Sequence, residues 1–267
     1  MKERYTMGYD GAWTRHLQQR SAAQEAGFFL PYLHPKMSLL DCGCGPGTIT
    51  AGLTERVAPG SVVGLDIGLD HLRLGRAHAR ERSFPNIYFV AGDAYDLPFA
   101  AGSFNAVFIH NVLSHLKNPS GVLKEIHRIL LPGGIIGMSH PDYSGHLIAP
   151  FDPLLEQAHK LVWRLVEHNG GNPAIGKHQC ALLHQAGFVH NQAAASFKTE
   201  DTQEKVRFRT AFEARRFVAS EIAEQFVELG WASRSELQKI SEAWKTWGEE
   251  PGAFKAHAVV TVVGCKG

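Results

Sequence analysis

A glycine-rich turn and two aspartates are the residues whose types and spacing best suit chemistry in this sequence. The turn spans residues 41–47 (DCGCGPG); Asp66 and Asp93 follow later apolar runs. Glycines lack a Cβ, so the backbone can turn sharply and approach a ligand closely, while amides at the next helix start donate hydrogen bonds. Asp66, 19 residues after Gly47, suits ribose hydroxyls, and Asp93 with the Ala94 amide suits adenine. Together these residues predict a site for one adenosine.

The elements that must position these residues alternate between strands and helices. Apolar runs predict strands over 37–42, 61–66, 86–91, 103–109 and 133–139. Helical spacing predicts helices between them over 48–57, 69–82 and 119–130. Strands separated by helices imply parallel β-α-β units, and strands apolar on both sides need helices on both faces. We therefore predict a doubly wound, Rossmann-like α/β sheet with the glycine turn and both aspartates at one edge.

The remaining segments add helices at both ends of this series. One helix-like segment is expected over 11–33, and past residue 140 we expect helices over 153–167 and 175–186 and strands over 188–197 and 257–265. Residues 200–248 predict two or three amphipathic helices. We divide the chain into an N-terminal helical cap (1–36), a Rossmann-like domain (37–199 and 254–267) and a helical insertion that covers the active site (200–253).

Composition argues against several classes of protein. The chain has 267 residues with 27 Lys and Arg against 26 Asp and Glu, so its net charge of +1 provides no large basic field for nucleic acid or anionic lipid. No stretch approaches the roughly 18 uninterrupted apolar residues of a membrane helix, and the first eleven residues lack the apolar core of a signal peptide. We expect no nucleic-acid partner, no membrane insertion and a cytoplasmic location.

Five segments resemble, in order and spacing, the successive motifs of class I S-adenosylmethionine-dependent methyltransferases. They are LLDCGCGPG (39–47), VVGLDIG (62–68), AGDAYDLPF (91–99), SFNAVFIHNVLSHLKNP (103–119) and EIHRILLPGG (125–134). They are most similar to the subgroup typified by ubiquinone and menaquinone C-methyltransferases. The resemblance implies S-adenosylmethionine as the cofactor and a seven-stranded sheet whose last strand is antiparallel.

The resemblance also implies cofactor-binding residues, all of them at strand ends. They are Asp41, Gly43, Gly45, Gly47, Asp66, Ile67, Asp93, Ala94, His110 and Asn111. The first four resemble the loop around the methionine moiety, Asp66 resembles the ribose-binding acid with Ile67 against adenine, and Asp93 with Ala94 resembles the adenine clamp. The last two match the position whose backbone faces the methionine carbons.

Catalysis by such a protein needs little beyond alignment, because the sulfonium already activates the methyl group. Where the acceptor is a hydroxyl or an acidic carbon, a histidine can remove the proton. The catalytic candidates are His140, Tyr143 and His110, and the substrate-binding candidates are Tyr9, Trp13, His115, His140 and Tyr143. Each of them has a packing role as its alternative. A metal site of His110, His115, His140 and His146 lacks the usual ligand spacing, so we expect none.

Two further groups of side chains have open roles. Aromatic residues of the late insertion either cover the acceptor pocket or pack the added helices: Phe208, Phe212, Phe217, Phe226 and Trp231. Basic residues between 198 and 216 alternate with acids and predict a solvated face: Lys198, Lys205, Arg207, Arg209, Arg215 and Arg216.

The function predicted from these observations is S-adenosylmethionine-dependent methyl transfer by in-line displacement to a small-molecule acceptor. The methylated atom can be carbon, oxygen or nitrogen. A homodimer is left open. One alternative is an NAD-dependent oxidoreductase, because Asp66 would also suit the NAD ribose. Against it, the turn lacks G-x-G-x-x-G spacing and contains Pro46. The other alternative is a non-catalytic cofactor-binding module, since a fold and a cofactor loop do not establish turnover.

Overall fold

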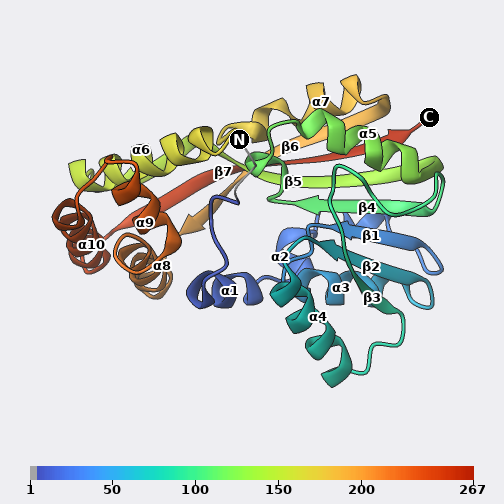
Figure 1. The fold of residues 1–267 in the computed structure, drawn as a ribbon, viewed down its shortest axis with the longest axis horizontal. Helices are drawn as coiled ribbons and strands as arrows, with labels where there is room; N and C mark the ends of the chain where they lie inside the picture. Colours follow the sequence, from blue (N-terminus) through green and yellow to red (C-terminus); the bar gives the residue numbers. More distant parts are fainter. Residues whose placement is uncertain (1–4) are drawn as a thin grey trace.

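The computed structural model describes residues 5–267, which are built around a seven-stranded sheet (Figure 1). The strand order is β3-β2-β1-β4-β5-β7-β6. The strands are β1 (Ser38–Cys42), β2 (Ser61–Asp66), β3 (Ile87–Ala91), β4 (Phe104–His110), β5 (Leu130–Ala149), β6 (Phe188–Glu200) and β7 (Phe254–Lys266). The first five pair in parallel, and β7 runs antiparallel to both β5 and β6. The predicted fold class, with its antiparallel last strand, is confirmed.

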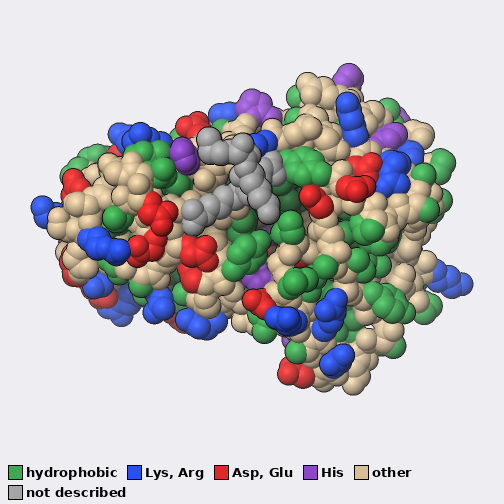
Figure 2. Space-filling model, in the orientation of Figure 1, with side chains coloured by type: hydrophobic (Ala, Val, Ile, Leu, Met, Phe, Trp, Pro, Cys, Tyr) green, Lys and Arg blue, Asp and Glu red, His purple; other side chains and the backbone are tan. Residues whose placement is uncertain are grey.

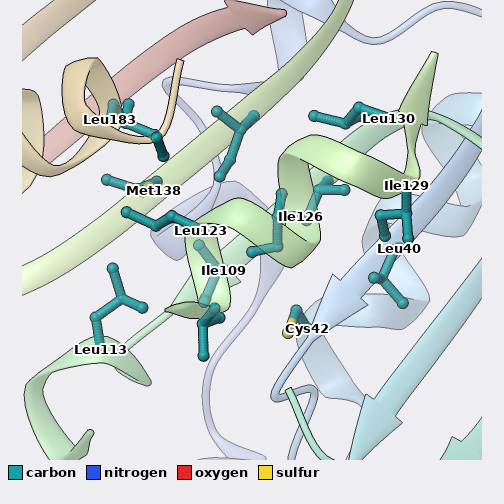
Figure 3. Close-up of a cluster of buried hydrophobic side chains, with 14 of the residues drawn as sticks. Leu40, Cys42, Ile109, Leu113, Leu123, Ile126, Ile129, Leu130, Met138 and Leu183 are labelled. Atoms are coloured by element: carbon teal, nitrogen blue, oxygen red, sulfur yellow. The ribbon is translucent and has the colours of Figure 1, made fainter. Parts of the chain in front are cut away.

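Helices cover both faces of the sheet because its strands alternate apolar side chains between the two sides. On one face, Leu40 and Cys42 of β1 share a core with α5 (Pro119–Ile129), as Figure 3 shows. On the other face, Leu39 packs with α3 (Thr48–Val57). The remaining elements of this half are α4 (Leu69–Glu81) and the 3-10 turn η2 (Leu113–His115). The crossovers therefore hold the ends of β1, β2, β3 and β4 at one edge.

The segment before the sheet is broken into short elements instead of the single helix expected over 11–33. They are α1 (Gly11–Gln18), α2 (Ala22–Glu25) and the 3-10 turn η1 (Leu30–Tyr32). Ser21 is extended, and its hydroxyl caps α2 by accepting from the Gln24 amide. This break turns the chain after α1, so that Arg20 and Glu25 lie in a cavity wall. Residues 1–4 of the predicted cap lie outside the described residues.

The late helices form a lobe with a core of its own, seen at the left of Figure 1. They are α6 (Pro153–His168), α8 (Gln203–Arg216), α9 (Glu221–Glu228) and α10 (Arg234–Gly248). The sequence had placed 153–167 with the sheet domain, whereas Leu161 and Leu165 of α6 pack in the core of this lobe. The 3-10 turn η3 (Ile175–His178) and α7 (Gln179–Gln185) instead pack in the core beside the sheet, as the sequence division had placed them.

The surface of the protein carries mixed charge. Figure 2 shows acidic and basic side chains interspersed over the visible face, consistent with the net charge of +1. Within residues 5–267, no helix combines the length and the apolar character that crossing a membrane requires.

Candidate active site

A cavity of about 1560 Å³ opens at the carboxyl ends of β1, β2, β3 and β4. Its lining includes nearly all of the predicted cofactor-binding residues: Asp41, Gly43, Gly45, Asp66, Ile67, Asp93, Ala94, His110 and Asn111. The opposite wall comes from α1, α8 and the facing ends of β6 and β7. Pockets for one drug-sized ligand measure roughly 300 to 1,000 Å³, so this cavity has room for a cofactor and a second molecule.

The glycine turn has the backbone conformation that favours glycine. Gly43, Gly45 and Gly47 have φ values of 79°, 53° and 78°. A Cβ on Gly45 would meet nothing nearer than Leu17 Cδ1 at 3.9 Å, so the backbone at Gly45 is open toward the cavity. Gly47 is a correction: it does not line the cavity, and a Cβ there would lie 2.8 Å from the Phe89 ring. Its role is close packing at the start of α3.

The Asp66 carboxylate ties this turn to the end of β2. Its Oδ2 accepts a hydrogen bond from the Gly45 amide at 2.8 Å, and its Oδ1 accepts from the Gly68 amide at 2.7 Å. Each carboxylate oxygen can accept a second hydrogen bond, which leaves capacity for two ligand hydroxyls. Ile67, beside it in the cavity wall, is 68% exposed, which suits an aromatic base. These features fit the adenosyl part of the expected cofactor.

Asp41 is a buried acid beside the turn. Only 2% of the residue is exposed, and its Oδ2 accepts from Thr50 Oγ1 at 2.6 Å. Burial raises the pKa of Asp41 to about 7, the charge of Asp66 adds to this effect, and the Thr50 hydrogen bond opposes it. A cationic ligand in the cavity would favour ionisation of this carboxyl.

His110 forms a buried pair with Glu25, a residue that no sequence pattern singled out. His110 Nε2 lies 3.0 Å from Glu25 Oε2, and Lys198 binds the same oxygen. Burial opposes ionisation of Glu25, but His110 and Lys198 outweigh it and hold the pKa of Glu25 well below its usual range. Burial and the charge of Arg20 lower the pKa of His110 to about 4, against the pull of Glu25. At neutral pH, Nε2–H therefore donates to Glu25, which leaves the lone pair on Nδ1.

His140, the first catalytic candidate, is a correction, because it is fully buried and does not line the cavity. Its Nε2 accepts from the backbone amides of Val112 and Leu113 at 3.3 and 3.0 Å. Its Nδ1 then donates to Gln179 Oε1 at 3.0 Å. Burial lowers the pKa of His140 to about 3, and with both ring nitrogens engaged it holds the segment after β4 and has no free nitrogen facing the cavity.

The other substrate-binding candidates all line the cavity: Tyr9, Trp13, His115 and Tyr143. Trp13 Nε1 donates to Tyr5 Oη at 3.0 Å, and the ring of Tyr5 meets His115 edge-on at a centroid distance of 4.9 Å. From α8, Phe208 and Phe212 extend this aromatic wall. The other three aromatic residues named for the insertion, Phe217, Phe226 and Trp231, pack in or against the core of the helical lobe.

The basic residues expected on a solvated face differ in where they lie. Arg207 and Arg215 are exposed outside the cavity, as predicted. Lys205 is exposed and Lys198 half-buried, and both line the cavity. Arg209 and Arg216 contradict the prediction, because their side chains are only 19% and 12% exposed and line the cavity. They share one face of α8 with Phe212, which a helical spacing of three and four residues explains.

Comparison with known proteins identifies the family. The family described as "Methyltransferase domain" matches residues 33–206, so the chain belongs to it. An uncharacterized methyltransferase of Schizosaccharomyces pombe is 28% identical, over 92% of this chain and 90% of that protein. A demethylmenaquinone methyltransferase of Lactococcus lactis is 34% identical, over 67% and 66%. A probable methyltransferase of Aspergillus luteorubrus is 36% identical, and the match spans half of its length.

Solved structures share the fold. The YcgJ protein from Bacillus subtilis has a TM-score of 0.60 at 18% identity, covering 94% of this chain and 98% of that one. A geranyl diphosphate methyltransferase has a TM-score of 0.55 at 18% identity, covering 98% and 85%.

The chain is thus an S-adenosylmethionine-dependent methyltransferase, as its motifs predicted, and the NAD-dependent alternative is set aside. Asp41, Asp66 and the open backbone at Gly45 fit that cofactor. Among residues 5–267, no group of three or more His, Cys, Asp or Glu side chains is placed to hold a metal ion.

Proposed function

We propose that this methyltransferase acts on a small molecule bound between His110 and the aromatic wall of α1 and α8. The supporting observation is one cavity that joins the glycine turn, Asp66 and the His110–Glu25 pair to this wall. The related demethylmenaquinone methyltransferase and the structurally similar geranyl diphosphate methyltransferase are named for small acceptors, which also favours this proposal. A cytoplasmic location and a homodimer stay predictions.

The side chains divide the work of the reaction. Bound S-adenosylmethionine supplies a methyl group already activated by its sulfonium. Asp66 and the turn hold the cofactor, while Trp13 and Phe212 shape the acceptor site and exclude water. His110 takes the acceptor proton on Nδ1, and Glu25 orients the ring through Nε2 and stabilises the imidazolium that forms.

The test compares wild type with His110→Gln on a panel of small phenols, quinols and amines, with S-adenosylhomocysteine formation as the readout. We expect turnover of at least one acceptor by wild type and about 100-fold or greater loss of kcat in the variant, with normal cofactor binding. His184→Gln is the matched control, because His184 is exposed and does not line the cavity. Full activity of His110→Gln would remove His110 as the base; no product above the blank would contradict the small-molecule assignment.

A further inference from the structure

The cavity is divided by charge. Its cofactor side is lined by four acids, Asp41, Asp66, Asp70 and Asp93, and, within the described residues, by no Lys or Arg. The facing wall holds five cations, Arg20, Lys198, Lys205, Arg209 and Arg216, and three acids, Glu25, Glu200 and Glu204. Five positive charges against three negative ones leave a net charge of +2 on that wall. Such a division favours a cation on one side and an anion on the other.

Arg20 is the cation of this wall with the least compensation. Within residues 5–267, its guanidinium has no ion pair or side-chain hydrogen bond, and it lies 5.7 Å from the centre of the Trp13 ring. Glu25, a nearby carboxylate, is already engaged by His110 and Lys198. Arg20 is half-buried in the cavity wall, and a partly desolvated charge without a partner is unfavourable, so Arg20 is suited to an anion that enters the cavity.

Arg209 carries a second unsatisfied donor. Its Nη2 lies 3.1 Å from Glu213 Oε1, but the same carboxylate also binds Arg216 at 3.4 Å. The buried Nε of Arg209 has no hydrogen-bond partner, and the Glu200 carboxylate lies 3.9 Å from it. An arginine Nε–H can only donate, and buried donors without acceptors are rare in folded proteins. An acceptor atom from a ligand would satisfy it.

Two histidines of this wall have further unpartnered nitrogens, as does His115 elsewhere in the cavity lining. The Nδ1 atoms of His16 and His257 are buried without a hydrogen-bond partner. Burial and the neighbouring charges, Arg209 among them, lower the pKa of His16 to about 3 and that of His257 to about 2. Both rings are therefore neutral at pH 7, and each can donate one N–H toward a ligand.

We propose that this wall, through Arg20 and Arg209, binds an anionic group of the methyl acceptor, a carboxylate or a phosphate. The inference rests on the proposed function, because it assigns a chemical class to the acceptor of that same site. Glu200, whose Oε2 is also unpartnered, lies beside Arg209 and would repel a second anionic group. We therefore expect only one anionic group of the acceptor at Arg209. The acceptor's remaining apolar part would contact Trp13 and Phe212.

The test is calorimetric titration of the protein saturated with S-adenosylhomocysteine. The probes are benzoate, phenyl phosphate and the neutral benzyl alcohol. We expect one of the anions to bind about tenfold or more tightly than the alcohol, and which one it is distinguishes carboxylate from phosphate. Arg20→Gln and Arg209→Gln should each lower the anion affinity about tenfold and leave the alcohol affinity unchanged.

Matched controls come from α8, which carries Arg209, and from α1, which ends two residues before Arg20. Arg15→Gln on α1 and Arg207→Gln on α8 alter exposed arginines outside the cavity, so anion affinity should not change. Arg20→Gln should also unfold at an unchanged or higher temperature, since it removes an uncompensated charge, whereas a structural role predicts a lower one.

Three results would overturn the proposal. The first is equal binding of the anions and the alcohol, and the second is anion binding that survives both Arg20→Gln and Arg209→Gln. The third is a loss of S-adenosylhomocysteine affinity in Arg20→Gln while anion affinity is retained. That result would assign Arg20 to the cofactor. If the wild type binds the anion but does not bind S-adenosylhomocysteine, the proposed function is contradicted and the anion site is supported.

Discussion

Asp41 should make cofactor binding depend on pH. Burial raises the pKa of this carboxyl to about 7, so in the free protein it is protonated below that pH. A cationic cofactor beside the turn favours the ionised form, and binding must therefore release the proton. The sign follows: affinity for S-adenosylmethionine falls as pH decreases below about 7 and levels off above it.

The size of this effect follows from the fraction of Asp41 that is ionised. With a pKa of about 7, that fraction is about one half at pH 7 and about one hundredth at pH 5, so affinity should drop about 50-fold. Calorimetry at both pH values measures it, and at pH 7 two buffers with different ionisation enthalpies should report the release of about half a proton. Burial lowers the pKa values of His110 and His115 to about 4, so both rings stay neutral over this range.

Asp41→Asn is the control for this prediction. Asparagine keeps the size of the side chain and an oxygen for Thr50, so binding should be weaker at pH 7 and independent of pH. An acid with a raised pKa in the folded state loses stability as pH rises from its unfolded value toward the folded one. The variant should therefore unfold at the same or a higher temperature at pH 7. Equal wild-type affinities at both pH values, without proton release, would refute the reasoning.

Three further substitutions test other parts of the site. Asp66→Ala should weaken S-adenosylhomocysteine binding by about 1 to 3 kcal/mol in calorimetry, because ribose hydroxyls lose their acceptors, and unchanged affinity would be evidence against that contact. Gly47→Ala should cost about 1 to 3 kcal/mol in urea unfolding, since φ is 78° and the new Cβ meets the Phe89 ring, whereas an unchanged midpoint would contradict this packing. His140→Ala should destabilise by about 2 to 4 kcal/mol by leaving two buried amides without an acceptor, and full stability with lost turnover would restore it as a catalytic candidate.

The first half of the fold follows from local pattern. Residues 48–57 and 61–66 were predicted as a helix and a strand, and α3 and β2 have those bounds. Apolar runs, glycine and helix spacing are all short-range signals. By contrast, β5 reaches Ala149 because β7 continues beside it, with Ala149 opposite Phe254. Such a pairing depends on a segment about 100 residues away, which local pattern does not contain.

In the site, too, local sequence pattern located some residues and missed others. Asp66, Asp93 and His110 could be predicted as cavity residues because each stands at the end of a parallel strand, and parallel strands end at one edge of the sheet. Along β5, Pro141 and Tyr143 line the cavity while His140 is turned away. Side chains alternate along a strand, so His140 and Tyr143, three residues apart, could not both face the cavity. This conflict could have been seen from the sequence.

Glu25 and Arg209 offered no comparable signal. Glu25 can be buried because Lys198, 173 positions later, brings a positive charge to it and His110 a hydrogen-bond donor, both from the sheet. Arg209 faces inward because α8 packs near α1, where Phe212 stacks on His16 at a centroid distance of 4.7 Å. Contacts between segments far apart in sequence decide which charged side chains are buried.

A crystal structure of the protein grown with S-adenosylhomocysteine tests the central claim most directly. The account predicts the ligand in the cavity at the ends of β1, β2, β3 and β4, with ribose hydroxyls on Asp66 and the sulfur on the side of His110. Density for the ligand elsewhere, or side chains closed over the turn in its place, would contradict the account.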